Sequence, residues 1–192
     1  KRVAARKRSC REERESVMEV IVAKTAGFCF GVKRAVDQVK RQIAEGRKPI
    51  YTYGPIIHNE EVVRDLEEKG VRVLNGKEDL LSVKKGTVVI RSHGVSRDVC
   101  EKIEARGMKI VDATCPFVKK IHRIVDEEGR KGRHVVIIGS ADHPEVQGIM
   151  GWASGPVTVI HTSEEAEQFV PENGKPISIV AQTTFNYNKF KD

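Results

Sequence analysis

The chain has 192 residues, of which 39% are hydrophobic and 32% charged, a composition typical of a soluble globular protein with one large or two small domains. It has no apolar stretch near the roughly 20 residues that span a bilayer. The basic residues 1–17 lack the apolar centre and cleavage site of a signal peptide. We therefore expect a cytoplasmic protein with no membrane partner.

The net charge of +7 is concentrated at the N-terminus, because residues 1–17 hold seven Lys or Arg and three Glu. The remaining positive charge is mixed with acidic residues along amphipathic segments, which favours a solvated surface over nucleic-acid binding. A basic pocket for an anionic substrate would also fit. We interpret residues 1–17 as a non-native or upstream-translated tail, with Met18 as the natural start and no role for Cys10.

Short apolar, β-branched runs alternate with amphipathic segments along the rest of the chain. This alternation predicts an α/β fold with mostly parallel sheets, built as two four-stranded layers. We expect a first α/β domain over 18–114 and a second over 115–192. The predicted strands are 20–23, 50–53, 71–74, 88–91, 110–112, 135–138, 157–160 and 177–181, and the predicted helices are 32–45, 60–69, 97–106 and 117–130, with C-terminal caps at Gly46, Gly70 and Gly107.

Chemically capable side chains follow most of these predicted strands. In open α/β sheets, ligands bind outside the carboxyl ends of the strands, so turns at those ends share one crevice. We therefore expect a single active site from these turns rather than scattered polar residues. The candidates are Cys29, His58, His93, Cys115, His143, Glu145 and Thr183.

Two of the candidates are cysteines. Cys29 lies between Gly27 and Gly31, where the backbone can approach the sulfur closely. Cys115 precedes Pro116 and is a plausible helix N-cap, a position that favours the thiolate form, which ligates metals. For each of the two cysteines, three interpretations stay open: a metal ligand, a nucleophile or a buried structural thiol. Cys100 falls within a predicted helix, and we interpret it as structural.

The histidines divide into two groups. His58 and His93 lie in turns flanked by Pro or Gly, and several such histidines in one crevice suit a phosphate or diphosphate. The alternative for either one is a loop histidine bonded to backbone. We expect the other three, His122, His134 and His161, to be surface residues.

His143 and Glu145 stand two residues apart and match the H-x-E of zinc deaminases, but no cysteine follows Cys115 to complete that motif. A carboxyl group partly removed from water can act as a proton donor, which makes Glu145 a candidate acid. Thr183 is a candidate proton relay or, alternatively, a helix cap. The common zinc, nucleotide and dinucleotide motifs are missing from the sequence.

Residues 18–192 resemble the 4-hydroxy-3-methylbut-2-enyl diphosphate reductases, the LytB/IspH family. The resemblance rests on the segments AGFCFGVKRAV, GPIIHNEEVV, SHGVS, DATCPFV, HPEV and AQTT. It implies three α/β lobes around a 4Fe–4S cluster held by three cysteines. By motif, Cys29 and Cys115 would be cluster ligands and Glu145 the proton donor, with Thr183 linking it to the substrate hydroxyl. The remaining three, His58, His93 and His143, would hold the substrate diphosphate.

The reaction implied by the resemblance is reductive dehydroxylation of (E)-4-hydroxy-3-methylbut-2-enyl diphosphate to isopentenyl and dimethylallyl diphosphate, the last step of the non-mevalonate pathway. The electrons would come from a ferredoxin- or flavodoxin-type donor. The sequence ends at TTFNYNKFKD, before a third cysteine or third domain. We therefore expect a C-terminally truncated chain that is inactive alone and loses its cluster.

The residues by themselves leave two other function classes open. The first is a metal-dependent hydrolase or lyase that acts on a phosphorylated small molecule. The second is a nucleic-acid-binding module, for which the basic tail is the motive and the 5% aromatic content a counterargument.

Overall fold

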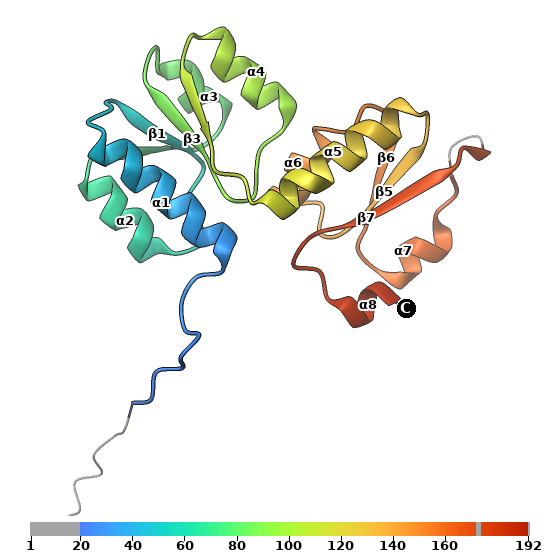
Figure 1. Ribbon diagram of the computed structural model, residues 1–192. Coiled ribbons are helices and arrows are strands. Elements are labelled where there is room, and N and C mark those ends of the chain that lie inside the picture. Colours follow the sequence, from blue (N-terminus) through green and yellow to red (C-terminus); the bar gives the residue numbers. More distant parts are fainter. Residues whose placement is uncertain (1–19, 172–173, 192) are drawn as a thin grey trace, which may run out of the picture.

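The computed structural model describes residues 20–171 and 174–191 (Figure 1). The predictions for residues 1–17, including Cys10, and for Met18 concern residues outside these ranges. Within them, none of the helices combines the length and apolar character needed to span a membrane.

Two parallel sheets form the framework (Figure 1). The four-stranded sheet has the order β2-β1-β3-β4 and the three-stranded sheet the order β6-β5-β7. Seven predicted strands are confirmed to within a residue. Their bounds are β1 (Ile50–Tyr53), β2 (Val71–Leu74), β3 (Thr87–Ile90), β4 (Lys109–Asp112), β5 (His134–Ile138), β6 (Val157–Ile160) and β7 (Ile177–Ala181).

The predicted strand over 20–23 is wrong. Val20, Ile21 and Val22 lie in an irregular segment with 75%, 81% and 75% of their surfaces exposed. A strand forms by hydrogen bonding to a neighbouring strand, and neither described sheet pairs with this segment. The prediction of two four-stranded layers therefore holds for the first sheet and fails for the second.

The four predicted helices are confirmed, and each of the three predicted glycine caps has a positive φ just past its helix. A helix expected to open after the last strand is present at Tyr187–Lys191. Three helices were missed because six or seven residues are too few for a recognisable 3.6-residue period. The described helices are α1 (Phe30–Ala44), α2 (Glu60–Glu68), α3 (Lys77–Ser82), α4 (Arg97–Ala105), α5 (Pro116–Arg130), α6 (Pro144–Met150), α7 (Ser163–Gln168) and α8 (Tyr187–Lys191).

The first sheet is covered by helices on both faces, as the alternation of its side chains requires. Val89 packs with α1 and α2 in one apolar cluster, and the adjacent Val88 packs with α3 and α4 in another. A third cluster joins the second sheet to α5 and α6 around Val135 and Ile137. We call the first sheet with α1–α4 the N-terminal lobe and the second sheet with α5–α8 the C-terminal lobe.

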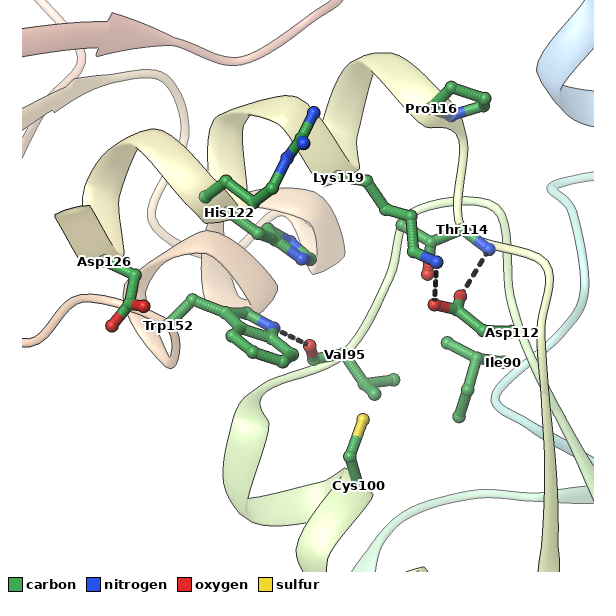
Figure 2. Close-up of a pocket in the computed structure, with 11 residues that line it drawn as sticks. Ile90, Val95, Cys100, Asp112, Thr114, Pro116, Lys119, His122, Asp126 and Trp152 are labelled. Carbon is green, nitrogen blue, oxygen red and sulfur yellow. Dashed lines mark hydrogen bonds and ion pairs between the residues drawn. The ribbon is translucent and has the colours of Figure 1, made fainter.

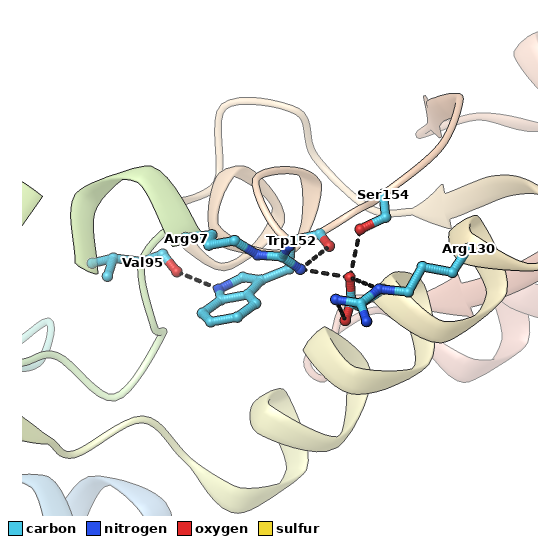
Figure 3. Close-up of polar contacts among 6 residues, drawn as sticks. Val95, Arg97, Arg130, Trp152 and Ser154 are labelled. Carbon is cyan, nitrogen blue, oxygen red and sulfur yellow. Dashed lines mark hydrogen bonds and ion pairs between the residues drawn. The ribbon is translucent and has the colours of Figure 1, made fainter. Parts of the chain in front are cut away.

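A network of polar contacts joins the lobes between the start of α4 and the residues after α6 (Figure 3). The Trp152 indole N–H donates to the Val95 carbonyl at 2.8 Å, and the Arg97 guanidinium donates to Asp126 on α5 at 2.5 Å. Gly151 lies so close to Ser96 that a Cβ there would come within 2.2 Å of the Ser96 Cβ. The close approach fixes the carboxyl ends of both sheets relative to each other.

Candidate functional site

Three histidines from both lobes come together at the carboxyl ends of the strands. His58 follows β1, His93 follows β3 and His143 follows β5. The ring centroids are 4.7 Å apart for His58 and His93, 5.5 Å for His93 and His143, and 6.3 Å for His58 and His143. One nitrogen from each ring lies within 4.8 Å of the others. The three residues therefore form one cluster, which we call the histidine cluster.

The backbone around each histidine fixes its place. The residue after His58 is Asn59, whose side chain caps α2 by accepting from the Val62 N–H at 3.0 Å. His143 caps α6, and its Nδ1 accepts from the Glu145 N–H at 3.1 Å. Because Nδ1 is the acceptor, a neutral His143 carries its proton on Nε2, which can donate to a ligand.

Two members of the histidine cluster, His93 and His143, have pKa values below the ordinary value of histidine. Burial, together with the positive charges of His58, Arg91 and His143, lowers the pKa of His93 to about 4. Burial also lowers the pKa of His143, although the Glu145 charge opposes the shift. An anion placed among these rings would supply the negative charge that the cluster lacks and would raise both pKa values.

Arg91 is a site residue that the sequence analysis missed. Its Nε donates to the Gly94 carbonyl at 3.3 Å, and a Cβ on Gly54 would lie 2.6 Å from its Nη1. The guanidinium therefore fills the space between the turn that leads to His58 and the turn that carries His93. Residue 91 was predicted only as the end of a strand. The sequence did contain one signal for a role of this residue, because a charged side chain stands at the carboxyl end of an otherwise apolar strand.

Glu145 and Thr183 form a hydrogen-bonded pair in which the carboxylate is buried and the threonine is exposed. Glu145 is 2% exposed on α6, and Thr183 follows β7. The Thr183 N–H donates to Oε1 at 2.6 Å, and its hydroxyl donates to Oε2 at 2.8 Å. Since Glu145 is two residues from His143, the pair lies beside the histidine cluster. A protonated Glu145 could pass its proton to the Thr183 oxygen, whose own hydrogen would then point away from the carboxyl group.

The two candidate cysteines cap neighbouring helices. Cys29 is the exposed N-cap of α1, and Cys115 is the half-buried N-cap of α5, with Pro116 as first helical residue as predicted. A Cβ on Gly31 would lie 2.7 Å from the Cys115 sulfur. Arg34 of α1 donates to the backbone carbonyl that precedes Cys115 at 3.1 Å. The irregular segment 20–23 replaces the strand expected before Cys29, so the start of α1 positions this thiol.

Cys100 and the remaining histidines follow their predictions only in part. Cys100 lies within α4 against the apolar cluster, as predicted, and burial raises its pKa to about 11. His161 is exposed, also as predicted. The surface assignment of His122 and His134 is wrong, because each is 6% exposed. His122 stacks on Trp152, and His134 begins β5, where a ring nitrogen lies 2.9 Å from the hydroxyl oxygen of Thr158.

The chain is similar to curated diphosphate reductases over nine tenths of its length. The 4-hydroxy-3-methylbut-2-enyl diphosphate reductase of Geobacter sulfurreducens is 48% identical over 175 residues, which cover 91% of this chain and 60% of the relative. The protein of the same name from Clostridioides difficile is 42% identical over 169 residues, 88% of this chain and 60% of the relative. The chain thus spans about 60% of the length of the curated relatives it matches.

Solved structures show the same similarity. A structure of (E)-4-hydroxy-3-methyl-but-2-enyl diphosphate reductase, the terminal enzyme of the non-mevalonate pathway, matches with a TM-score of 0.76 at 41% identity over 90% of this chain and 60% of that one. The Plasmodium falciparum E-1-hydroxy-2-methyl-but-2-enyl-4-diphosphate reductase matches with a TM-score of 0.80 at 28% identity over 88% of this chain and 52% of that one.

The family model described as LytB protein matches residues 20–192, nearly the entire chain. Family, relatives and solved structures agree with the resemblance found in the sequence. The chain belongs to the LytB protein family.

Proposed function

We propose that this chain binds 4-hydroxy-3-methylbut-2-enyl diphosphate and delivers a proton to it in a reductive dehydroxylation that yields isopentenyl and dimethylallyl diphosphate. The observation that carries the proposal is the histidine cluster, where one nitrogen from each of three rings, contributed by both lobes, lies within 4.8 Å of the others. The names of the relatives support the same substrate. Overall, the substrate takes up two electrons and two protons, its C–O bond breaks, a C–H bond forms, and water leaves.

The diphosphate is assigned to His58, His93 and His143. Neutral imidazoles donate one hydrogen bond each, and protonated ones add a charge-assisted bond to a phosphate oxygen. Arg91 adds positive charge next to the cluster. A diphosphate bound here raises the pKa of His93 from about 4, so that binding takes up protons.

Proton delivery is assigned to Glu145 and Thr183. The carboxyl group protonates Thr183 Oγ1 across the 2.8 Å contact while the hydroxyl passes its own hydrogen to the substrate oxygen. The Thr183 N–H keeps the carboxylate in place through Oε1 at 2.6 Å. The leaving hydroxyl therefore departs as water rather than as hydroxide.

Cys29 and Cys115 are proposed as two ligands of an iron–sulfur cluster. Thiolates are the donors that iron–sulfur clusters use, and both thiols cap helices whose N-termini approach each other at Gly31, so the residues present fit the group. When bound, such a cluster supplies electrons one at a time. We further propose that the cluster is of the 4Fe–4S type, that a ferredoxin- or flavodoxin-type protein donates the electrons, and that the protein is cytoplasmic.

A second candidate is favoured by the same histidine cluster. Three imidazole nitrogens are also the ligand set of a catalytic zinc ion, which would make the protein a metal-dependent hydrolase or lyase of a phosphorylated compound. This candidate predicts stoichiometric zinc and activity that a chelator removes. It assigns no role to Cys29 and Cys115.

The test is reduction of 4-hydroxy-3-methylbut-2-enyl diphosphate by an anaerobically prepared holoenzyme that carries these residues within a chain of the relatives' length, with reduced methyl viologen as electron source. Residues 1–192 alone are expected to be inactive. We expect isopentenyl and dimethylallyl diphosphate as products. Glu145→Gln should lower turnover about 10²- to 10⁴-fold, the usual contribution of a general acid. Release of phosphate without reduction, together with stoichiometric zinc, would contradict the proposal and support the hydrolase.

A further inference from the structure

A cavity of about 540 Å³ lies between the lobes, apart from the histidine cluster (Figure 2). Ile90, Val95 and Cys100 of the N-terminal lobe form one side, and the opposite side comes from α5 and Trp152. None of the proposed diphosphate, proton-transfer or cluster residues lines it. The volume lies within the roughly 300–1,000 Å³ typical of small-molecule sites, which also occur preferentially between domains.

All but one of the ionisable groups around the cavity are paired or neutral. Asp112 forms an ion pair with Lys119 at 2.5 Å, and Asp126 is held by Arg97. Burial raises the pKa of Cys100 to about 11 and, for His122, lowers the pKa to about 4, so both are uncharged near neutral pH.

Arg123 is the one lining charge without an ion pair among the described salt bridges, and it is exposed. Its guanidinium is therefore hydrated by solvent, and its positive charge is not buried in the cavity. The walls consequently offer a charged ligand no buried counter-charge.

Aromatic rings form part of the wall. His122 extends from α5 into the space between Trp152 and Lys119 (Figure 2). Its ring stacks on Trp152 with centroids 5.4 Å apart and planes 16° from parallel. Flat apolar walls of this kind favour a planar ligand.

We propose that the cavity between Val95, Cys100, His122 and Trp152 is a second binding site, which takes an uncharged mono- or bicyclic aromatic molecule. Such a ligand would contact both lobes at once. The proposal does not rest on the histidine cluster: if the second site is disproved, the proposed reductase function still stands, and the reverse also holds.

The test compares two probes with the same ring system, uncharged 1-naphthol and anionic 1-naphthoate, by isothermal titration calorimetry near neutral pH. We expect one 1-naphthol per chain and at least tenfold weaker binding of 1-naphthoate. Because Trp152 is the only tryptophan, the protein has a single indole N–H signal in its NMR spectrum. That signal should shift with the same midpoint as the calorimetric titration.

Two substitutions at one position provide the matched control. Cys100→Phe fills the cavity and should weaken 1-naphthol binding at least tenfold, whereas Cys100→Ala leaves the cavity open and should retain binding. If circular dichroism shows that Cys100→Phe does not fold, the smaller and more flexible Cys100→Met replaces it. The proposal is overturned if 1-naphthol does not bind, if 1-naphthoate binds as tightly, if the indole signal stays fixed, or if the filled variant binds like the parent.

Discussion

The Trp152 indole N–H donates to the backbone carbonyl of Val95 at 2.8 Å, and this bond ties the end of α6 to the turn that carries His93. Since α6 begins after His143, the bond fixes the spacing of two histidines from different lobes. The geometry of the histidine cluster therefore depends on this contact between the lobes, which we call the junction, as well as on the three histidines themselves.

Trp152→Phe should weaken both the junction and the cluster. The variant keeps an aromatic ring against His122 but loses the hydrogen bond, so we expect about 1–2 kcal/mol less stability and several-fold weaker pyrophosphate binding. Urea denaturation and calorimetric titration measure the two effects. Val39→Ala, in the core between α1 and the sheet, should cost stability without changing pyrophosphate affinity. Equal losses of affinity in both variants would refute the positioning role.

Gly31→Ala should disturb the approach of the two cysteine-capped helices. The new Cβ would lie 2.7 Å from the Cys115 sulfur, too close for a normal contact, and overpacking of this kind costs about 1–3 kcal/mol. We expect a lower iron content in the anaerobically prepared holoenzyme. Lys33→Ala, an exposed change on the same helix, is the control and should keep its iron. Undiminished iron in Gly31→Ala would show that the thiols need no such proximity.

Thr183→Val tests the proton relay. The variant keeps the backbone N–H that holds Glu145 but removes the hydroxyl, so substrate binding should persist while turnover falls about 10²- to 10⁴-fold. Thr183→Ser should restore much of the rate. Thr184→Val, at the neighbouring exposed hydroxyl, should have little effect. Normal turnover in Thr183→Val would exclude the hydroxyl from proton delivery.

His122 should make the fold sensitive to acid. Its pKa is about 4 in the folded protein and about 6.5 in an unfolded chain, so the unfolded chain takes up a proton between these values that the folded protein does not. Lowering the pH through this window should therefore cost up to about 3 kcal/mol of stability. His122→Phe should flatten this dependence, and His161→Phe, at an exposed histidine, should not. The check is urea denaturation at about pH 7 and about pH 4.5.

The elements that could be predicted from the sequence are those with a clear local hydrophobic pattern. Seven strands and the four long helices follow from alternation and 3.6-residue periodicity. The segment 20–23 has the composition of a strand but no pairing partner in either described sheet, and pairing is a property of the whole fold. The short α6 escaped detection, although its first turn carries Glu145.

Candidate site residues were easier to predict than their surroundings. Placement after parallel strands indicated that His58, His93 and His143 would share a crevice, and the structure brings them together. The burial of His122 could not be predicted, because it depends on Gly94 of the other lobe and on Trp152, which is 30 residues further along the chain. Arg91 was missed for a similar reason, since its role arises between two turns that are distant in sequence.

The measurement that tests the central claim most directly is calorimetric titration with inorganic pyrophosphate, repeated in two buffers of different ionisation enthalpy. Because the pKa of His93 lies near 4 in the free protein and an anion raises it, binding should take up protons. We predict that His93→Ala binds at least tenfold more weakly with less proton uptake, and that His161→Ala binds like the parent. Pyrophosphate binding that is unchanged in His93→Ala would contradict the account.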